Sequence, residues 1–208
     1  MTRELSRSGA GPGRQDILEA AAVAFTRNGY DATTIDDIAD ELRATKGRVY
    51  HYYRSKADIF LDVVHTGMRD LLAEIRPLAE GDDDAVGRLE RMVRTHAAMM
   101  MTRHAFQRVA VQAVEMRRLG QGPRYESLHE IVAMRDEYEQ LFADVVAQGQ
   151  REGSVRGTDP RLATKPVLGA LNWITVWYDP DRGDDGRVER IADEYAEFVV
   201  GGLRKGDR

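Results

Sequence analysis

The residues best suited to bind another molecule lie between residues 43 and 56, where five basic side chains occur without an acid. The same stretch holds three tyrosines and one histidine, whereas residues 31–41 carry five acids and no base. Arg and Lys side chains can pair with guanine edges or neutralise phosphates, and Tyr hydroxyls can donate to phosphate oxygens. A solvated basic surface is the alternative for an isolated run of five charges. The composition therefore favours a polyanion as the partner, provided that a helix presents these side chains together.

Two short helices joined by a tight turn are predicted to position this basic stretch. Thr34 and Asp37 form a helix start signal, and Thr45 is a second one that precedes residues 46–52. Only Arg43 and Ala44 separate the two predicted helices, which indicates a helix–turn–helix. The apolar residues of the first helix recur at i, i+3, i+4 and i+7, on one face: Ile35, Ile38, Ala39 and Leu42. A basic second helix in such a pair points to DNA.

The segment from Gly29 to Lys56 closely resembles the N-terminal domain of the tetracycline-repressor (TetR) family. That family has a Gly-x-x-x-Thr-Thr lead, an Ile-Ala pair, a Ser/Thr-x-Gly-x-Leu-Tyr-x-His/Tyr-Phe helix and a Ser-Lys, and this chain reads DATTIDDIA, TKGRVYHYY and SK. The chain departs from the family in the turn, where Arg43 and Ala44 replace the usual Gly and Val. Since a left-handed turn residue costs a non-glycine about 1 kcal/mol, the turn must either form differently or tolerate that strain.

The resemblance implies which side chains contact double-stranded DNA. Lys46 and Arg48 are expected at base edges, where a good bidentate contact is worth about 1–3 kcal/mol of discrimination. Tyr50, Tyr52 and Lys56 are expected to anchor phosphates, the last of them at a helix N-terminus. The full set of implied contacts is Thr34, Thr45, Lys46, Arg48, Tyr50, His51, Tyr52 and Lys56.

Length and charge are compatible with this interpretation. The 208 residues suffice for one large or two small cores, and the net charge is −5. Residues 1–56 carry nine bases and eight acids, so the basic signal is local and an acidic body would limit nonspecific adhesion to DNA. The chain has no cysteine, which excludes disulfides and thiolate metal sites and is compatible with a reducing cytosol. Because no run approaches the roughly 18–20 apolar residues of a membrane span, no membrane partner is expected.

The rest of the chain shows helical spacing without sustained alternation or internal repeats, which predicts an all-α fold. A disordered arm is expected at residues 1–13, a three-helix head at 14–56, a connecting helix at 56–75 and a six-helix ligand-binding and dimerisation body at 76–208. Asp159 and Pro160 form a helix start, Pro166 is expected to kink that helix, and Gly120–Pro123 is a break. The resemblance implies a homodimer through helices 159–178 and 188–203, and therefore a palindromic operator.

The body is expected to hold a small effector. The segment LNWITVWYDP, residues 171–180, resembles a subgroup of the family that senses acyl-CoA thioesters in fatty-acid and sterol-ring catabolism. This implies an apolar pocket for an acyl chain with nearby arginines for CoA phosphates. The alternative is that these side chains form core and that the arginines are solvated or paired. The candidate lining is Met99, Met100, Arg103, Phe106, Met116, Arg135, Tyr138, Phe142, Trp173 and Trp177.

Two other functions deserve comparison. A sensor of aromatic or cationic drugs that controls an efflux pump is the alternative within the family, but no acidic cage is evident among the aromatic residues. An enzyme of the helical-bundle di-metal class would need two Glu-x-x-His units, and only Glu126–His129 is complete. The five histidines contain no i, i+4 pair for zinc, and no nucleophile elbow or phosphate loop occurs. A regulator without enzymatic activity, metal or cofactor is therefore expected.

Overall fold

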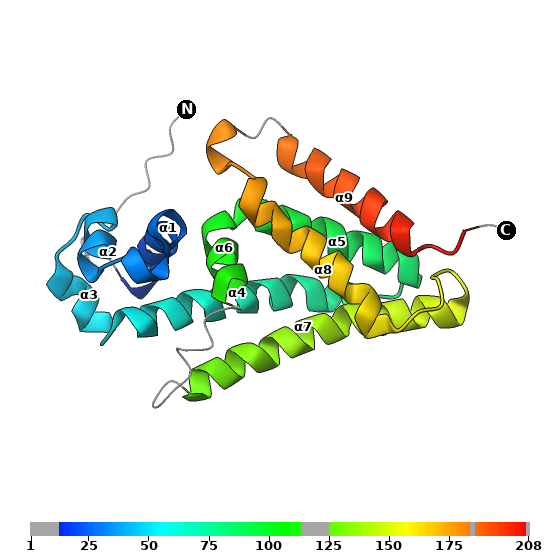
Figure 1. Ribbon diagram of the computed structural model, residues 1–208, viewed down its shortest axis with the longest axis horizontal. Helices are drawn as coiled ribbons and strands as arrows, with labels where there is room; N and C mark the ends of the chain where they lie inside the picture. Colours follow the sequence, from blue (N-terminus) through cyan, green and yellow to red (C-terminus); the bar gives the residue numbers. More distant parts are fainter. Residues whose placement is uncertain (1–12, 114–124, 184–185, 207–208) are drawn as a thin grey trace. The chain divides into compact units, whose positions relative to one another are not determined.

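The computed structural model describes residues 13–113, 125–183 and 186–206 (Figure 1). Within these residues it contains nine α-helices, one short 3-10 helix and no strand, which confirms the all-α prediction. The predicted arm up to residue 12, the cavity candidate Met116 and the break at Gly120–Pro123 lie outside the described residues. The elements are α1 (Arg14–Ala32), α2 (Ile35–Glu41), α3 (Lys46–Tyr52), α4 (Lys56–Ala79), α5 (Ala85–Thr102), α6 (His104–Gln112), α7 (Tyr125–Glu152), α8 (Pro160–Trp177), η4 (Pro180–Arg182) and α9 (Arg187–Leu203).

The chain forms two compact units, Met1–Val63 and Val64–Arg208, and α4 contributes residues to both. In the first unit α1 packs against α2, and α2 against α3. Of the α2 side chains that the apolar spacing placed inside, Ile38 and Ala39 are buried while Ile35 and Leu42 are half-buried, and the start of α4 adds Ile59 and Phe60. The buried residues of this unit include Ile17, Leu18, Phe25, Ile38, Ala39, Val49 and Tyr53.

Two of the three predicted start residues cap their helices, whereas Thr45 lies at the N-cap of α3 without a side-chain hydrogen bond to it. The Thr34 backbone N–H donates to Asp37 Oδ2 at 2.7 Å, and the Asp37 N–H donates back to Thr34 Oγ1 at 3.1 Å. This reciprocal pair satisfies two N–H groups that the first turn leaves without helical partners. At α8 the Leu162 N–H donates to Asp159 Oδ1 at 2.8 Å, with Pro160 in the first helical position. Both start signals are thereby confirmed.

The turn between α2 and α3 is formed in the left-handed conformation. Arg43 has φ +54° and, in the described part of the chain, is the only non-glycine residue with positive φ. Its N–H donates to the Asp40 carbonyl at 3.0 Å, and the Ala44 N–H donates to the Ala39 carbonyl at 2.9 Å. The turn therefore closes with good hydrogen bonds, and Arg43 tolerates the strain that a glycine would avoid.

The second unit is built around α5, which packs against α7, α8 and α9 (Figure 1). Its core joins side chains from these helices with Met68, Leu72 and Ile75 of α4. The fully buried members include Leu89, Met92, Phe142, Leu171 and Ile174. Both α4 and α8 continue past a proline, at Pro77 and Pro166 respectively. This unit therefore has one contiguous apolar core. Because several helices share that core, several helices also line any cavity in it.

Candidate DNA-binding surface and effector cavity

Helix α3 turns its polar side chains outward while Val49 anchors it in the core of the first unit. Tyr50 is 50% exposed and Tyr52 is 39% exposed, which is unusual for side chains of this size. Thr45, Lys46 and His51 are also exposed, and Arg48 is half-buried. The structure thus brings the predicted base and phosphate contacts of α3 together on one accessible surface.

Lys46 forms an ion pair with an acid of the preceding helix. Its Nζ lies 2.8 Å from Asp36 Oδ2, and this hydrogen bond raises the pKa of Lys46. Both side chains are about half exposed or more, so water and salt screen the pair. The ammonium is therefore held near α2 by a contact that a nucleic acid can replace.

Two aromatic side chains of α3, His51 and Tyr52, contact each other, and the Tyr52 ring also contacts Arg48. The Arg48 guanidinium lies 5.4 Å from the centroid of the Tyr52 ring, within cation–π range. The Tyr52 ring in turn meets the His51 ring edge to face, with their centroids 5.0 Å apart. These contacts restrict the rotamers of the half-buried Arg48 and of the exposed His51 and Tyr52, which lowers the entropic cost of binding through them.

Lys56, which the sequence assigns to a phosphate, has acceptors within the protein. Its Nζ donates to the carbonyl oxygens of Tyr30, Asp31 and Thr33 at 2.6, 3.1 and 2.7 Å. It also lies 4.5 Å from the centroid of the Tyr30 ring. These contacts use all three N–H donors of the ammonium and fix the start of α4 to the chain that leaves α1. The Thr34 hydroxyl likewise has an acceptor within the protein, since it donates to Asp37 Oδ2 at 2.7 Å.

Tyr53 occupies the core, and its hydroxyl has the outlet that a buried tyrosine needs. The hydroxyl donates to Asp62 and accepts from Arg14 Nε at 3.1 Å, while Arg14 Nη2 lies 2.7 Å from Asp62 Oδ2. Burial, with the hydrogen bond to Asp62, raises the pKa of Tyr53. This network ties α1 to α4 behind the exposed face of α3.

The second unit has a cavity of about 380 Å³ between its helices, partly open to the surface at Lys165 and Gly169. This is within the range of small-molecule sites, toward its lower end. Its apolar lining is Met68, Leu71, Met100, Ala110, Val111, Leu168 and Gly169. Its polar lining is His96, Gln107, Arg135, Tyr138, Glu139, Lys165 and Asn172. The cavity thus combines an apolar wall with a small set of hydrogen-bonding groups, which is the composition of a ligand site.

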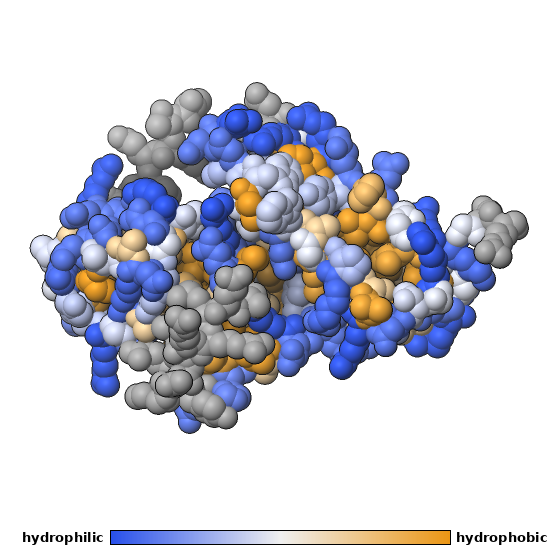
Figure 2. Space-filling model, viewed as in Figure 1, coloured by the Kyte–Doolittle hydropathy of each residue, from blue (hydrophilic) through white to orange (hydrophobic). Residues whose placement is uncertain are grey.

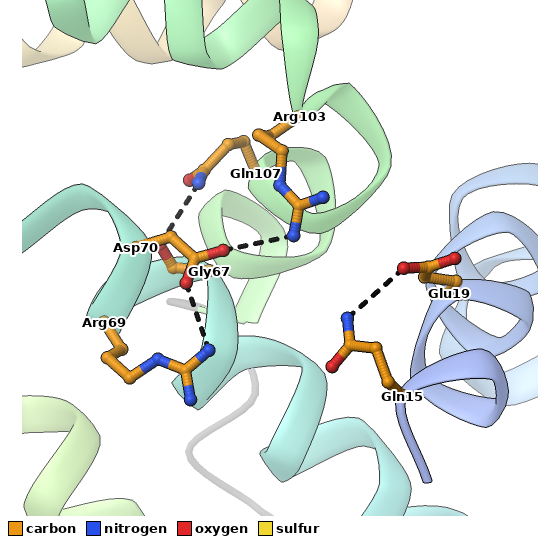
Figure 3. Close-up of polar contacts among 7 residues, drawn as sticks. All are labelled: Gln15, Glu19, Gly67, Arg69, Asp70, Arg103 and Gln107. Atoms are coloured by element: carbon orange, nitrogen blue, oxygen red, sulfur yellow. Dashed lines mark hydrogen bonds and ion pairs between the residues drawn. The ribbon is translucent and has the colours of Figure 1, made fainter. Parts of the chain in front are cut away.

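The structure places three of the predicted effector residues on this cavity, namely Met100, Arg135 and Tyr138. The remaining described candidates lie elsewhere. Met99 is half-buried against the core, while Phe106 and Phe142 are buried in it. Arg103 donates to Asp70 Oδ2 at 3.1 Å (Figure 3). Trp173 and Trp177 are 61% and 41% exposed and are not among the lining residues.

Sequence reasoning missed His96, Gln107 and Asn172, which contribute much of the polar lining. One signal was available for the first of them. His96 falls within the apolar face of α5, between Met92 and Met100 at four-residue spacing, where a histidine must be buried. Gln107 and Asn172 have no comparable signal, because amides are common on solvated helix faces.

Burial controls the protonation of the cavity. It lowers the pKa of His96 to about 3 and raises the pKa of Tyr138, so both rings are neutral near neutral pH. Burial also lowers the pKa of Arg135, whose Nη2 donates to the Ala110 carbonyl at 2.6 Å. Lys165 pairs with Glu139 at 2.7 Å. Arg135 and Lys165 therefore supply the positive charge that borders the apolar space.

A second surface of this unit is apolar. On α8 the large exposed side chains Leu162, Trp173, Val176 and Trp177 follow one helical stripe, and Phe198 of α9 is 83% exposed. Gly169, on the same stripe of α8, is also exposed. Figure 2 shows pale and orange areas where α8 and α9 face the viewer. Apolar patches of this kind mark interaction sites in soluble proteins.

Two classes of site are not found in the described ranges. No three His, Asp or Glu side chains within them could hold a metal ion together. The helices that the structure describes also include none that is long and apolar enough to cross a membrane. The Glu126–His129 unit therefore has no companion ligands among the described residues.

Comparison with known proteins matches both units. Residues 17–63 match the family model of bacterial regulatory proteins of the tetR family, and residues 82–203 match the tetracyclin repressor-like C-terminal domain. The chain is 30% identical over 198 residues to the HTH-type transcriptional repressor KstR2 of Rhodococcus jostii, covering 94% of this chain and 93% of the relative.

Solved structures extend this similarity to the fold. The ketosteroid transcriptional regulator KstR2 of Mycobacterium tuberculosis has a TM-score of 0.80 at 26% identity, covering 96% of this chain and all of that one. AibR, solved in complex with isovaleryl coenzyme A and operator DNA, has a TM-score of 0.74 at 22% identity, covering 91% and 97% of the two chains.

Proposed function

This chain belongs to the TetR family of bacterial regulatory proteins, and on that basis we propose that it is a homodimeric transcriptional repressor released from a palindromic operator by a small effector. The observation that carries the proposal is the outward face of α3, which holds basic and tyrosine side chains in the second helix of a helix–turn–helix. In such a motif the second helix enters the major groove of DNA. The chain is thus a regulator of transcription rather than an enzyme.

The contacts on DNA divide into two kinds. Lys46 and Arg48, early on α3, read base edges, and Thr45 lies beside them at the helix start. Tyr50, His51 and Tyr52 contact the backbone with the hydroxyl and imidazole groups that they expose. The residues Thr34 and Lys56 support this surface from within, since their polar atoms hold the start of α2 and the start of α4.

The dimer forms through α8 and α9, which carry the exposed apolar stripe. Trp173, Trp177 and Phe198 supply the large aromatic contacts that anchor protein interfaces. Exposed Gly169, Gly201 and Gly202 leave room for close approach of a partner helix. A twofold dimer places two copies of α3 on one duplex and calls for an operator with two related half-sites.

The effector is an acyl-CoA thioester whose acyl part enters the cavity of the second unit. The apolar wall suits a hydrocarbon group, while Arg135 and Lys165 suit the negatively charged and carbonyl-bearing portion. Two relatives support this choice: KstR2 is a ketosteroid regulator, which suits a ring-shaped group, and AibR was solved with isovaleryl coenzyme A, which is a CoA thioester. The fold can therefore hold a CoA thioester, and the cavity volume admits a short or ring-shaped acyl group.

Release follows from the shared helix. Met68 and Leu71 of α4 line the cavity, and the other end of α4 is fixed by Lys56 next to α3. An effector that displaces Met68 and Leu71 acts on the same helix that supports the reading surface. It must bind the released form better by only about 3–5 kcal/mol to reverse the population.

The test titrates a protein–operator complex with CoA thioesters and, separately, with free CoA and with aromatic cations. We expect branched or ring-containing thioesters to dissociate the complex at concentrations at which free CoA does not. If the cations dissociate the complex and none of the thioesters does, the protein is a drug sensor rather than a sensor of acyl-CoA.

A further inference from the structure

Two buried polar atoms of the cavity have no hydrogen-bond partner. They are His96 Nε2 and Gln107 Oε1, and each residue is only 1% exposed. Both side chains line the same cavity in the second unit. Buried polar groups in folded proteins are nearly always paired. Two unpaired polar atoms that line the same cavity therefore indicate a ligand that forms hydrogen bonds with both.

The hydrogen-bond role of His96 follows from its neighbour. Tyr138 Oη lies 2.9 Å from His96 Nδ1, and within the described residues this is the hydrogen bond that the tyrosine makes. If Nδ1 donated to Tyr138, the hydroxyl proton of Tyr138 would have no acceptor among the described residues, so we assign the hydroxyl as the donor to Nδ1, which places the single proton of the neutral imidazole on Nε2. A side-chain hydrogen bond with Asn172 raises the pKa of the ring, but its alignment is too poor to satisfy Nε2. His96 therefore presents an unpaired N–H donor.

The role of Gln107 is fixed in the same way. Its Nε2 donates to the Gly67 carbonyl at 3.1 Å (Figure 3). Flipping the amide would place two oxygens against each other, so the orientation is set and Oε1 remains an acceptor. Gly67 is itself held close to α6, since a Cβ on it would lie 3.3 Å from the Phe106 carbonyl oxygen. Gln107 therefore presents an unpaired acceptor on a rigid support.

Among the polar groups that line the cavity, one donor and one acceptor are therefore unpaired, and both lie beside its apolar wall. A plain hydrocarbon satisfies neither of them, and a carbonyl oxygen satisfies only the donor. A hydroxyl group can accept from His96 and donate to Gln107. From this pairing we infer that the effector is an apolar molecule whose buried part carries a hydroxyl group. The inference rests on the proposed function because it concerns the same cavity.

The experiment compares matched ligands by calorimetry on the full chain. The first series contains the CoA thioesters of cyclohexanecarboxylic acid and of its hydroxylated forms, with the hydroxyl at each ring position in turn. The second series contains the same acids without CoA. We expect at least one hydroxylated member to bind about tenfold to a hundredfold more tightly than its parent, because the parent leaves both buried groups unpaired.

The two series separate the two hypotheses. If the thioesters fail to bind but a hydroxylated free acid binds better than its parent, acyl-CoA sensing is wrong and the hydroxyl inference stands. If thioesters bind and hydroxylation changes their affinity by less than about threefold, the function stands and the inference is wrong. An absence of any hydroxyl preference in both series also overturns the inference.

A variant of the cavity sharpens the test. Gln107→Met keeps the length of the side chain but removes the acceptor, so it should reduce the hydroxyl preference to within about threefold. A merely structural role would weaken both ligands equally. The matched control is Thr164→Val, which removes a buried hydroxyl bonded to the Arg161 carbonyl and not part of the cavity. It should retain the preference. If Gln107→Met does not fold, the ligand series on the unaltered protein still decides.

Discussion

The ammonium of Lys46 lies 2.8 Å from the carboxylate of Asp36, so a predicted reader of DNA is paired with an acid of the adjoining helix. The pair has two consequences for binding. Lys46 must exchange Asp36 for a base edge or phosphate, and the carboxylate that remains is close to the phosphate backbone. Because the pair is exposed, its effect should depend strongly on salt.

The variant Asp36→Asn should therefore bind DNA more tightly, by roughly tenfold at low salt and less at higher salt. Fluorescence anisotropy on an operator duplex over a salt series measures the effect. Asp40→Asn is the matched control, because it removes the same charge from α2 but no partner of Lys46. Equal gains for both variants would mean that the Asp36–Lys46 pair has no influence beyond net charge.

Lys56 should affect the stability of the first unit more than contacts with phosphate. Lys56→Met removes hydrogen bonds to three backbone carbonyls and should lower the free energy of unfolding of that unit by about 1–2 kcal/mol. Chemical denaturation gives this value, and the salt dependence of DNA binding gives the second readout. If the ammonium neutralised a phosphate, the variant would reduce the salt slope by about one, whereas we expect the slope to be retained.

The left-handed turn offers a stabilising substitution. Arg43→Gly should raise the unfolding free energy by about 0.5–1 kcal/mol, because glycine adopts φ +54° without the clash of a Cβ. Arg43→Ala is the control, since it removes the same charge but keeps the Cβ. Thermal unfolding of the two variants should separate them, with the glycine variant melting higher. Identical melting temperatures would show that the turn stores no strain.

If the dimer forms through α8 and α9, one substitution on that surface should produce a monomer. Phe198→Asp places a charge on the most exposed large apolar side chain among the described residues and should shift the protein to a monomer that no longer binds the full operator. Val132→Asp is the control, because Val132 is 48% exposed on α7 rather than on α8 or α9. Light scattering after size exclusion measures the mass. If the Phe198→Asp protein remains a dimer, the interface is not at this part of α9 and the proposal is wrong.

The buried histidine predicts a dependence of stability on pH. Folding lowers the pKa of His96 from about 6.5 to about 3, so the unfolded chain binds a proton that the folded chain excludes. Stability is therefore complete above about pH 6.5 and is lost as the pH falls, by roughly 1 kcal/mol between pH 7 and pH 5.5. His96→Gln should flatten this dependence, as denaturant titrations at the two pH values would show. An unchanged slope in the variant would assign the effect to other groups.

Local patterns were sufficient to predict several helix starts and much of the core of the first unit. The Thr34–Asp37 start, the Asp159–Pro160 start and the buried apolar stripes depend on residues a few positions apart, and the structure confirms them. The left-handed residue at the turn was one of two predicted outcomes. The sequence could not decide between them because the strain at Arg43 is offset by closure of the whole helix pair.

The cavity was predicted less well, for a physical reason. Apolar spacing shows that a residue is inside but not whether it faces a neighbour or an open space. Met100 and Phe142 share that signal, yet only Met100 lines the cavity. Trp173 falls at the helical spacing of a buried residue but lies on the exposed stripe of α8, because an exposed apolar stripe has the same spacing as a buried one.

The central claim is that the exposed face of α3 reads DNA. The most direct test is fluorescence anisotropy of the purified protein on its own upstream region, against a scrambled duplex of equal length, with Arg48→Ala beside the unaltered chain. The account predicts salt-sensitive binding that strongly favours the upstream region, and a preference that Arg48→Ala largely removes while weak binding to both duplexes persists. Equal affinity of the unaltered protein for the two duplexes at low salt, or an unchanged preference in the variant, would contradict it.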